Sequence, residues 1–177
     1  MIDELYKASE AGVQIDLIVR GICCLIPNQP YSRNIRITRI VDGFLEHARV
    51  WYFYHGGQEL VFFGSPDWMR RNLYRRIEAV TPVLDQALKE EMLEMLRIQL
   101  ADNQKASWVD EHLCNVLKKQ TDVKPIRAQK DFYQYLHKKN LPWGRFFFYN
   151  SNLCLMNWRI YSTVLSIPIT DESTQRW

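Results

Sequence analysis

The stretch from residue 44 to residue 76 constrains the fold more than any other part of this chain. It contains a run of aromatic and β-branched residues at 49–54, a Gly56-Gly57 pair and a second apolar run at 60–63. Two such runs joined by a glycine pair are typical of a β-hairpin, because glycine adopts the positive φ angles that tight hairpin turns require. The sequence therefore predicts a hairpin here.

Helix and strand signals alternate along the rest of the chain. Residues 2–9 repeat at helical spacing and are followed by Gly12, a residue that commonly ends helices. Asp85 is a favourable N-cap for a helix that reaches about residue 100. The patterns also predict a buried strand at 13–19, a loop at 27–34, apolar residues at helical spacing in 37–45, a strand at 77–83, and helices at 106–117 and 126–139. Mixed elements in this order indicate an α/β domain.

Two of these helices have predicted inner faces. On the helix after Asp85, the apolar residues share one face, and on the helix at 126–139 a similar set does so. The first set is Leu84, Leu88, Met92, Met95 and Leu96, and the second is Ile126, Phe132, Tyr133 and Leu136.

Bulk composition excludes several classes of protein. With 177 residues and 47% apolar residues, the chain is long enough for one full-sized globular domain. It has no apolar run of the ~18 residues that a membrane helix needs, and Met1 opens no signal peptide, so we expect a cytoplasmic location. The four cysteines include no CxxC pair, which favours reduced thiols over a zinc site, and we expect no metal ligands in this chain.

Two candidate site residues lie at the entry to the first strand of the hairpin. His47 and Arg49 are two residues apart, so a strand would project both side chains to one face. A histidine beside a cation keeps its neutral form near neutral pH, in which it can accept a proton, donate one or attack phosphorus. Arg20 ends the predicted strand at 13–19, and a guanidinium at a strand end can bind phosphate oxygens in a bidentate manner.

A second group of candidates follows the hairpin. The second strand of the hairpin ends at Gly64-Ser65, where glycine permits close backbone approach and serine offers a hydroxyl. Arg71 and Asn72 come next, in a run of arginines that suits contact with a polyanion, although such a run is more often a solvated face. The other three histidines lie on a turn or on predicted helices without partners, and we expect them to be structural or exposed.

The chain after residue 139 has a different character. It is rich in Phe, Asn, Ser and Tyr and shows little helical or alternating periodicity. We therefore divide the chain into a domain at 1–139 and an atypical tail at 140–177. The tail is either sequence appended by truncation or by a shifted reading frame, or a small hydrophobic element that packs on a partner chain.

Longer strings give the most specific information. The spacing His-x-Arg, then Gly-Ser, then Asn resembles the His-x-Lys, Gly-Ser and Asn pattern of the phospholipase D superfamily. The strings LYKASEAGVQIDLIVRGICCLIP, ITRIVDGFLEHARVWYF, GSPDWMRRNLYRRIEAVTPVLD and VKPIRAQ resemble the C-terminal region of bacterial polyphosphate kinase, an enzyme that makes inorganic polyphosphate from ATP. This resemblance covers about residues 1–138.

The resemblance implies a fold and a set of roles. The chain would be the second of two phospholipase-D-like domains, a mixed sheet flanked by helices, and the histidine that carries the phosphoryl group and the Mg²⁺ ligands would lie upstream of it. Arg20 would contact ATP phosphates, and His47 would assist phosphoryl transfer without itself becoming phosphorylated. Arg49, Ser65, Arg71 and Asn72 fall in the motif region and are assigned to the pocket.

The implied partners are ATP or ADP, inorganic polyphosphate and the upstream domains of the same enzyme. The whole enzyme would be a homo-oligomer that needs Mg²⁺, could associate with a membrane and would not bind DNA. Two alternatives stay open at this point. One is a phospholipase-D-type phosphodiesterase or nuclease that builds its site from two copies of the chain, and the other is a non-enzymatic fragment that binds polyanions.

Overall fold

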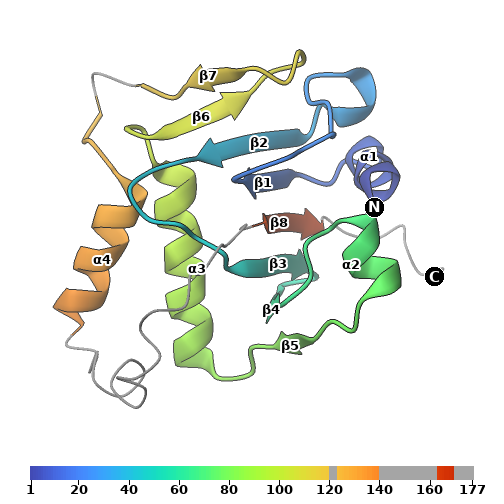
Figure 1. The fold of residues 1–177 in the computed structure, drawn as a ribbon. Helices are drawn as coiled ribbons and strands as arrows, with labels where there is room; N and C mark the ends of the chain where they lie inside the picture. Colours follow the sequence, from blue (N-terminus) through green and yellow to red (C-terminus); the bar gives the residue numbers. More distant parts are fainter. Residues whose placement is uncertain (120–122, 140–162, 170–177) are drawn as a thin grey trace.

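A single mixed sheet forms the centre of the molecule (Figure 1). The computed structural model describes residues 1–119, 123–139 and 163–169. The sheet has eight strands in the order β5-β4-β3-β8-β1-β2-β6-β7. The strands are β1 Ile15–Val19, β2 Ile35–Ile40, β3 Arg49–His55, β4 Gln58–Gly64, β5 Val80–Pro82, β6 Ala106–Val109, β7 Asn115–Leu117 and β8 Thr163–Ile169. The predicted α/β class and its sheet flanked by helices are confirmed.

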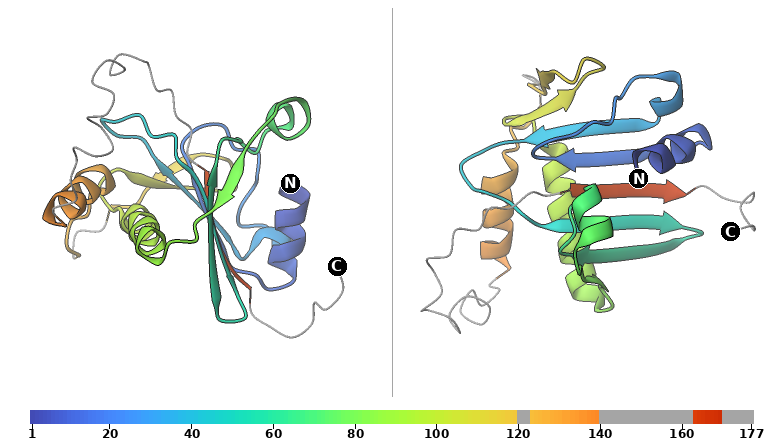
Figure 2. Two further views of the ribbon diagram at one scale, coloured as in Figure 1. Left: turned by 90° about the horizontal axis from the view of Figure 1, so that it is seen from below. Right: turned by 45° about the vertical axis from the view of Figure 1, so that its right-hand side comes forward.

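Helices cover both faces of the sheet. In the end-on view, α1 (Ile2–Glu10) and α2 (Arg70–Arg75) lie on one side, and α3 (Gln86–Ala101) and α4 (Ala128–Lys138) lie on the other (Figure 2). A short 3-10 turn, Pro30–Ser32, lies in the predicted loop between β1 and β2. No helix in the described part of the chain is long and apolar enough to cross a membrane.

Each face of the sheet has its own core. On the α1 side, Leu5 packs with Leu17, Ile37 and Trp51. On the α3 side, Leu93 and Leu96 pack with residues of the same strands that point the other way, among them Ile18, Ile40, Val50 and Val61. Because β1, β2 and β3 contribute to both cores, these strands are buried on both faces and lack a simple alternation of apolar and polar residues.

Several predicted elements are confirmed in detail. Gly56 and Gly57 form the hairpin turn with φ of +52° and +82°, as a tight two-residue turn requires. Asp85 caps α3 by accepting a hydrogen bond from the Leu88 backbone N–H at 2.9 Å. Gly12 follows α1 with φ of +93°, and β1 forms the expected buried strand.

Two predictions of helical structure are wrong. Residues 35–40, which carry apolar residues at helical spacing, form the strand β2, because Ile37 and Ile40 enter opposite cores. The helix predicted at 106–117 is the hairpin of β6 and β7, whose turn includes Leu113 with φ of +60°.

Parts of the predicted inner faces are also wrong. On α3, Leu84 and Leu88 are exposed, whereas Leu93 and Leu96 are buried. On α4, Tyr133 is exposed, and Ala128 and Gln129 are the buried residues. The predicted strand at 77–83 shortens to the three residues of β5, all of them exposed.

The strand β8 comes from the tail, where the sequence pattern predicts no element. It lies between β1, to which it is antiparallel, and β3, to which it is parallel. Residues 140–162 and 170–177 of the tail lie outside the described residues. The predicted boundary at residue 139 stays a prediction, but one strand of the sheet lies beyond it.

Candidate functional site

The pairing register brings several strand ends together at one end of the sheet. Val19, the last residue of β1, and Arg49, the first residue of β3, both pair with Thr163 of β8, so they lie in the same row. Gly64, at the end of β4, follows directly after Phe63, the partner of Val50. Arg20, Arg49 and the Gly-Ser strand end therefore lie at the same end of the sheet.

His47 and Arg49 form the centre of the site. Nη1 of Arg49 lies 3.0 Å from Nδ1 of His47, and Nη2 of Arg49 contacts Nε2 of the same ring. On its other side, Nε of Arg49 donates to Oδ1 of Asp67 at 3.0 Å. The side chains of Arg49 and Asp67 are 11% and 12% exposed, so this ion pair is largely shielded from water. Asp67 thus fixes the guanidinium against the imidazole.

The surroundings of His47 favour its neutral form. Burial lowers the pKa of the imidazole below its usual value, and the positive charges of Arg49 and Arg20 lower it further, with the carboxylate of Asp67 acting in the opposite direction. An arginine offers only donors, and a neutral imidazole accepts at one nitrogen and carries a proton on the other, so only one of the two contacts with Arg49 is a hydrogen bond to the ring.

Arg20 lies beside the same histidine. Its Nη1 donates to the backbone carbonyl of Glu46, the residue before His47, at 3.3 Å. The Glu46 carboxyl turns toward α3, where Nε2 of Gln99 donates to it at 3.4 Å. Burial raises the pKa of Glu46, and the hydrogen bond from Gln99 acts in the opposite direction.

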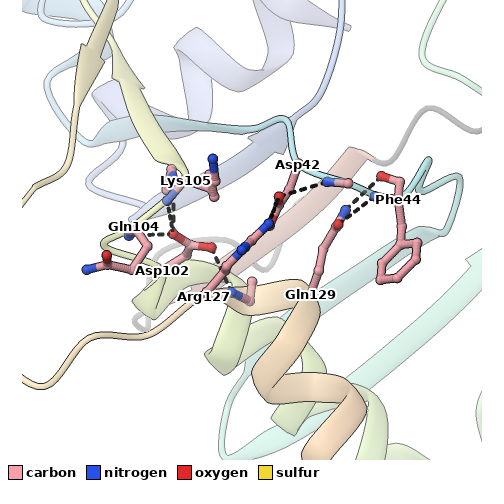
Figure 3. Close-up of polar contacts among 10 residues, drawn as sticks. Asp42, Phe44, Asp102, Gln104, Lys105, Arg127 and Gln129 are labelled. Atoms are coloured by element: carbon pink, nitrogen blue, oxygen red, sulfur yellow. Dashed lines mark hydrogen bonds and ion pairs between the residues drawn. The ribbon is translucent and has the colours of Figure 1, made fainter.

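The loop that carries Glu46 and His47 is held by α4 (Figure 3). Arg127 donates from Nε and Nη2 to the two carboxylate oxygens of Asp42, at 2.7 Å and 2.5 Å. Gln129 accepts from the Phe44 N–H and donates to the Phe44 carbonyl, both at 2.7 Å. These four hydrogen bonds fix the backbone at both ends of residues 42–44, just before the functional residues.

A buried carboxylate anchors α4 in turn (Figure 3). Asp102 is fully buried and accepts from the backbone N–H of Gln104 and Lys105 through Oδ1, at 2.9 Å and 2.7 Å, and from that of Ala128 through Oδ2, at 2.7 Å. It therefore ties the start of α4 to the turn before β6, and the position of Arg127 depends on it.

The Gly64-Ser65 strand end contacts β5 and Glu78. A Cβ on Gly64 would lie 2.4 Å from the carbonyl oxygen of Ala79, so the close approach that glycine allows is to β5. The Ser65 hydroxyl contacts the carboxylate of Glu78, and Asn72 donates to the same carboxylate at 2.7 Å. The hydrogen bonds from Ser65 and Asn72 lower the pKa of Glu78. Ser65 and Asn72 thus form a cluster next to the site, and Asn72 is buried in it.

Arg71 lies apart from this cluster. It is exposed on α2 and lines a mainly apolar cavity of about 360 Å³ between α1, α2 and the end of β1. Asp67 lines the same cavity while it pairs with Arg49. The structure therefore brings Arg20, His47 and Arg49 together, and it leaves Arg71 on the surface next to them.

Several residues of this arrangement were not predicted as site residues. They are Asp42, Glu46, Asp67, Arg127 and Gln129, each of which holds a predicted residue or its loop. A signal that could have found them is present in the sequence, because all five lie within the strings on which the family resemblance rests. Within the described residues, no group of three or more His, Cys, Asp and Glu could hold a metal ion.

Comparison with known proteins decides the family. A family model described as polyphosphate kinase C-terminal domain 2 matches residues 1–129. The chain belongs to the polyphosphate kinase family. Individual members are similar to this chain over most of its length, but the matched region is only a small part of each member's own length.

Three relatives illustrate this point. Polyphosphate kinase from Yersinia pestis is 46% identical over 143 residues, which are 80% of this chain and 21% of the relative. The enzyme from Escherichia coli strain K12 is 43% identical, with the same coverage. The crystal structure of polyphosphate kinase from Porphyromonas gingivalis has a TM-score of 0.77 at 59% identity, over 78% of this chain and 21% of that one. The chain thus spans about a fifth of the length of these polyphosphate kinases.

Proposed function

We propose that this chain forms one wall of the active site of an ATP:polyphosphate phosphotransferase. In that reaction the terminal phosphoryl group of ATP is added to a polyphosphate chain, reversibly, through a phosphohistidine on an upstream domain. The observation that carries the proposal is the contact between the His47 imidazole and the Arg49 guanidinium, with Arg20 beside them. The relatives are named polyphosphate kinases, which favours transfer over phosphodiester hydrolysis or a purely binding role.

The proposed roles follow from the chemistry of the side chains. Phosphoryl transfer requires positive charge around the transferred oxygens, and arginine supplies it with fixed donor geometry. Arg20 and Arg49 would bind phosphate oxygens, and Asp67 would keep Arg49 in position. His47, neutral near pH 7, would assist by exchanging a proton with the leaving or entering phosphate oxygen. We also propose the adjacent Ser65 and Asn72, and the exposed Arg71, as pocket residues.

Other parts of the proposed enzyme lie outside this chain. The upstream domains would contribute the phosphorylated histidine and the ligands of Mg²⁺. The residues described here do not fit a metal site of their own, so no step that we assign to this chain depends on a metal. Homo-oligomerisation and a cytoplasmic location of the whole enzyme remain expectations from the family resemblance.

Binding and turnover assays on the purified chain test the proposal. We expect weak binding of ATP and polyphosphate that decreases with salt, because the interaction is mainly between charges. Arg20→Ala should weaken ATP binding, with Arg97→Ala as a charge-matched control on the exposed face of α3. We expect no polymer synthesis without the upstream domains, and ATP-dependent synthesis by the chain alone would contradict the proposal. If Arg20→Ala and Arg97→Ala changed the affinity for ATP equally, the assignment of Arg20 to the ATP phosphates would be wrong.

A further inference from the structure

A second cavity, with a positively charged lining, lies on the half of the sheet formed by β2, β6 and β7. Its volume is about 400 Å³, within the range of small-molecule sites in proteins. Three cationic and three neutral polar side chains line it, and among the described residues no Asp or Glu does. They are Arg39, Lys105 and Lys119, with Gln104, Ser107 and Asn115.

Arg39 is the lining residue whose side chain is held in place by hydrogen bonds. It lies on β2 opposite Ser107 of β6, and the residue is half-buried. Its Nη1 donates to Oδ1 of Asn115 at 2.9 Å, and its Nη2 donates to the carbonyl oxygen of Gly21 at 3.1 Å. Its Nε is buried and has no acceptor in the part of the chain that the structure describes. The guanidinium thus meets only neutral acceptors, and an uncompensated charge in such a place is costly unless an anion binds there.

The two lysines add charge that no carboxylate of the described residues neutralises. Neither Lys105 nor Lys119 is a member of any of the five ion pairs found among those residues. Two carboxylates lie close to Lys105, and both are already bound elsewhere. Asp102 accepts from the Lys105 backbone N–H at 2.7 Å and from other backbone N–H groups. Asp42, whose pKa is lowered mainly by Arg127 and to a smaller extent by Lys105, forms a bidentate pair with Arg127. The field in the cavity is therefore positive.

We propose that this cavity binds an inorganic oligophosphate chain. Phosphate oxygens suit a guanidinium, two ammonium groups and the amide and hydroxyl donors around them. The apolar part of the lining is limited to Val41 and Leu117, and no aromatic ring of the described residues lines the cavity to stack on a nucleotide base, which favours an inorganic chain over ATP.

The position of the cavity links it to the first site. Arg39 binds the carbonyl of Gly21, and Gly21 directly follows Arg20. Both sites therefore adjoin the turn after β1, at the same end of the sheet. In this form the inference rests on the proposed function, since it assigns the cavity to the polyphosphate substrate of that same enzyme.

Calorimetry with inorganic tripolyphosphate and, separately, with ATP tests the inference on the purified chain. The double variant Lys105→Gln, Lys119→Gln should bind tripolyphosphate about tenfold more weakly than the parent, as the loss of two phosphate contacts implies. A control variant, Lys130→Gln with Lys138→Gln, loses the same charge from exposed positions on α4 and should change binding much less. Arg39→Gln is a further variant, and thermal unfolding verifies that each protein folds.

The outcomes separate this inference from the proposed function. Equal loss of tripolyphosphate affinity in the double variant and the control would overturn the inference, even if Arg20→Ala still weakens ATP binding. If only the double variant lost tripolyphosphate binding, the oligophosphate site in the cavity would be supported. If ATP binding were at the same time insensitive to Arg20→Ala, the proposed phosphate role of Arg20 would be contradicted. A double variant that loses ATP and tripolyphosphate equally would show that the cavity belongs to a nucleotide site, which also overturns the inference.

Discussion

The ion pair between Arg49 and Asp67 provides the sharpest test of the site. Asp67→Ala leaves the guanidinium of Arg49 almost buried, at 11% exposed, with its charge no longer compensated. Breaking a buried pair by removing one partner typically costs about 3–5 kcal/mol, and the slight exposure here places the expected loss near the lower end, at about 3 kcal/mol. For a chain of this size, that corresponds to a decrease in Tm of about 6–12 °C.

An exposed pair in the same sheet is the control. Arg36 binds Asp16 at 2.8 Å, and the Asp16 side chain is 17% exposed, but the Arg36 side chain that Asp16→Ala would leave without this partner is 67% exposed. Asp16→Ala should therefore cost less than about 1 kcal/mol, because exposed pairs contribute little. Asp67→Asn keeps an oxygen that can accept from Nε of Arg49 and should fall between these two variants.

Urea unfolding followed by tryptophan fluorescence measures the difference. Trp68 follows Asp67 and stacks on Trp51 with ring centroids 6.3 Å apart, so the signal reports on this region. NMR titration provides a second readout, because the Asp67 carboxylate raises the pKa of His47 and Asp67→Asn should lower it further. Equal losses of stability in Asp67→Ala and Asp16→Ala, with an unchanged pKa of His47, would refute the reasoning.

Three further predictions follow from the described residues. The pKa of His47 is lowered in the folded state, so the folded chain should keep its full stability above the unfolded pKa of about 6.5 and lose stability as the pH falls below it. His47→Gln should reduce this pH dependence of the unfolding free energy, measured from pH 8 to pH 5. An unchanged dependence in this variant would contradict the assignment. Gly64→Ala should destabilise the fold by about 1–3 kcal/mol in denaturant unfolding, because the new Cβ would meet the Ala79 carbonyl oxygen. Gly43→Ala is the control, since its Cβ would meet no atom within 4 Å and the variant should change stability little. Deletion of residues 141–177 should lower the Tm strongly, because it removes the strand between β1 and β3; a variant as stable as the parent would instead favour appended sequence outside the domain.

The sequence predicts those elements whose signal is local. The hairpin follows from Gly56-Gly57, and the start of α3 follows from Asp85, because turn and cap residues act on their own backbone. The strand β2 could not be recognised, since Ile35 and Ile37 enter one core and Ile40 the other, and a strand buried on both faces has no period of two. The hairpin of β6 and β7 was missed because each strand is too short to show a period.

The site was predictable to a similar degree. The spacing of His47 and Arg49 predicts that their side chains share one face, and the two side chains do meet, although His47 lies in the loop just before β3 rather than on the strand. Arg20 meets them only because β1 and β3 lie antiparallel across β8, which no local pattern indicates. The partners Asp67 and Arg127 come from other elements, and a pairing between distant segments depends on tertiary packing that single positions do not encode.

The place of β8 has a consequence for how the chain folds during synthesis. β1, β2, β6 and β7 form one part of the sheet and β3, β4 and β5 another. The strand that joins them, at residues 163–169, is the last of the described strands to be translated. Its contacts with β1 close a loop of more than a hundred residues, and contacts so far apart in sequence slow folding. Until β8 leaves the ribosome, β1 and β3 would each expose an unpaired edge, which is a site where other chains can add a strand. Yield on expression should therefore depend on chaperones that shield such edges.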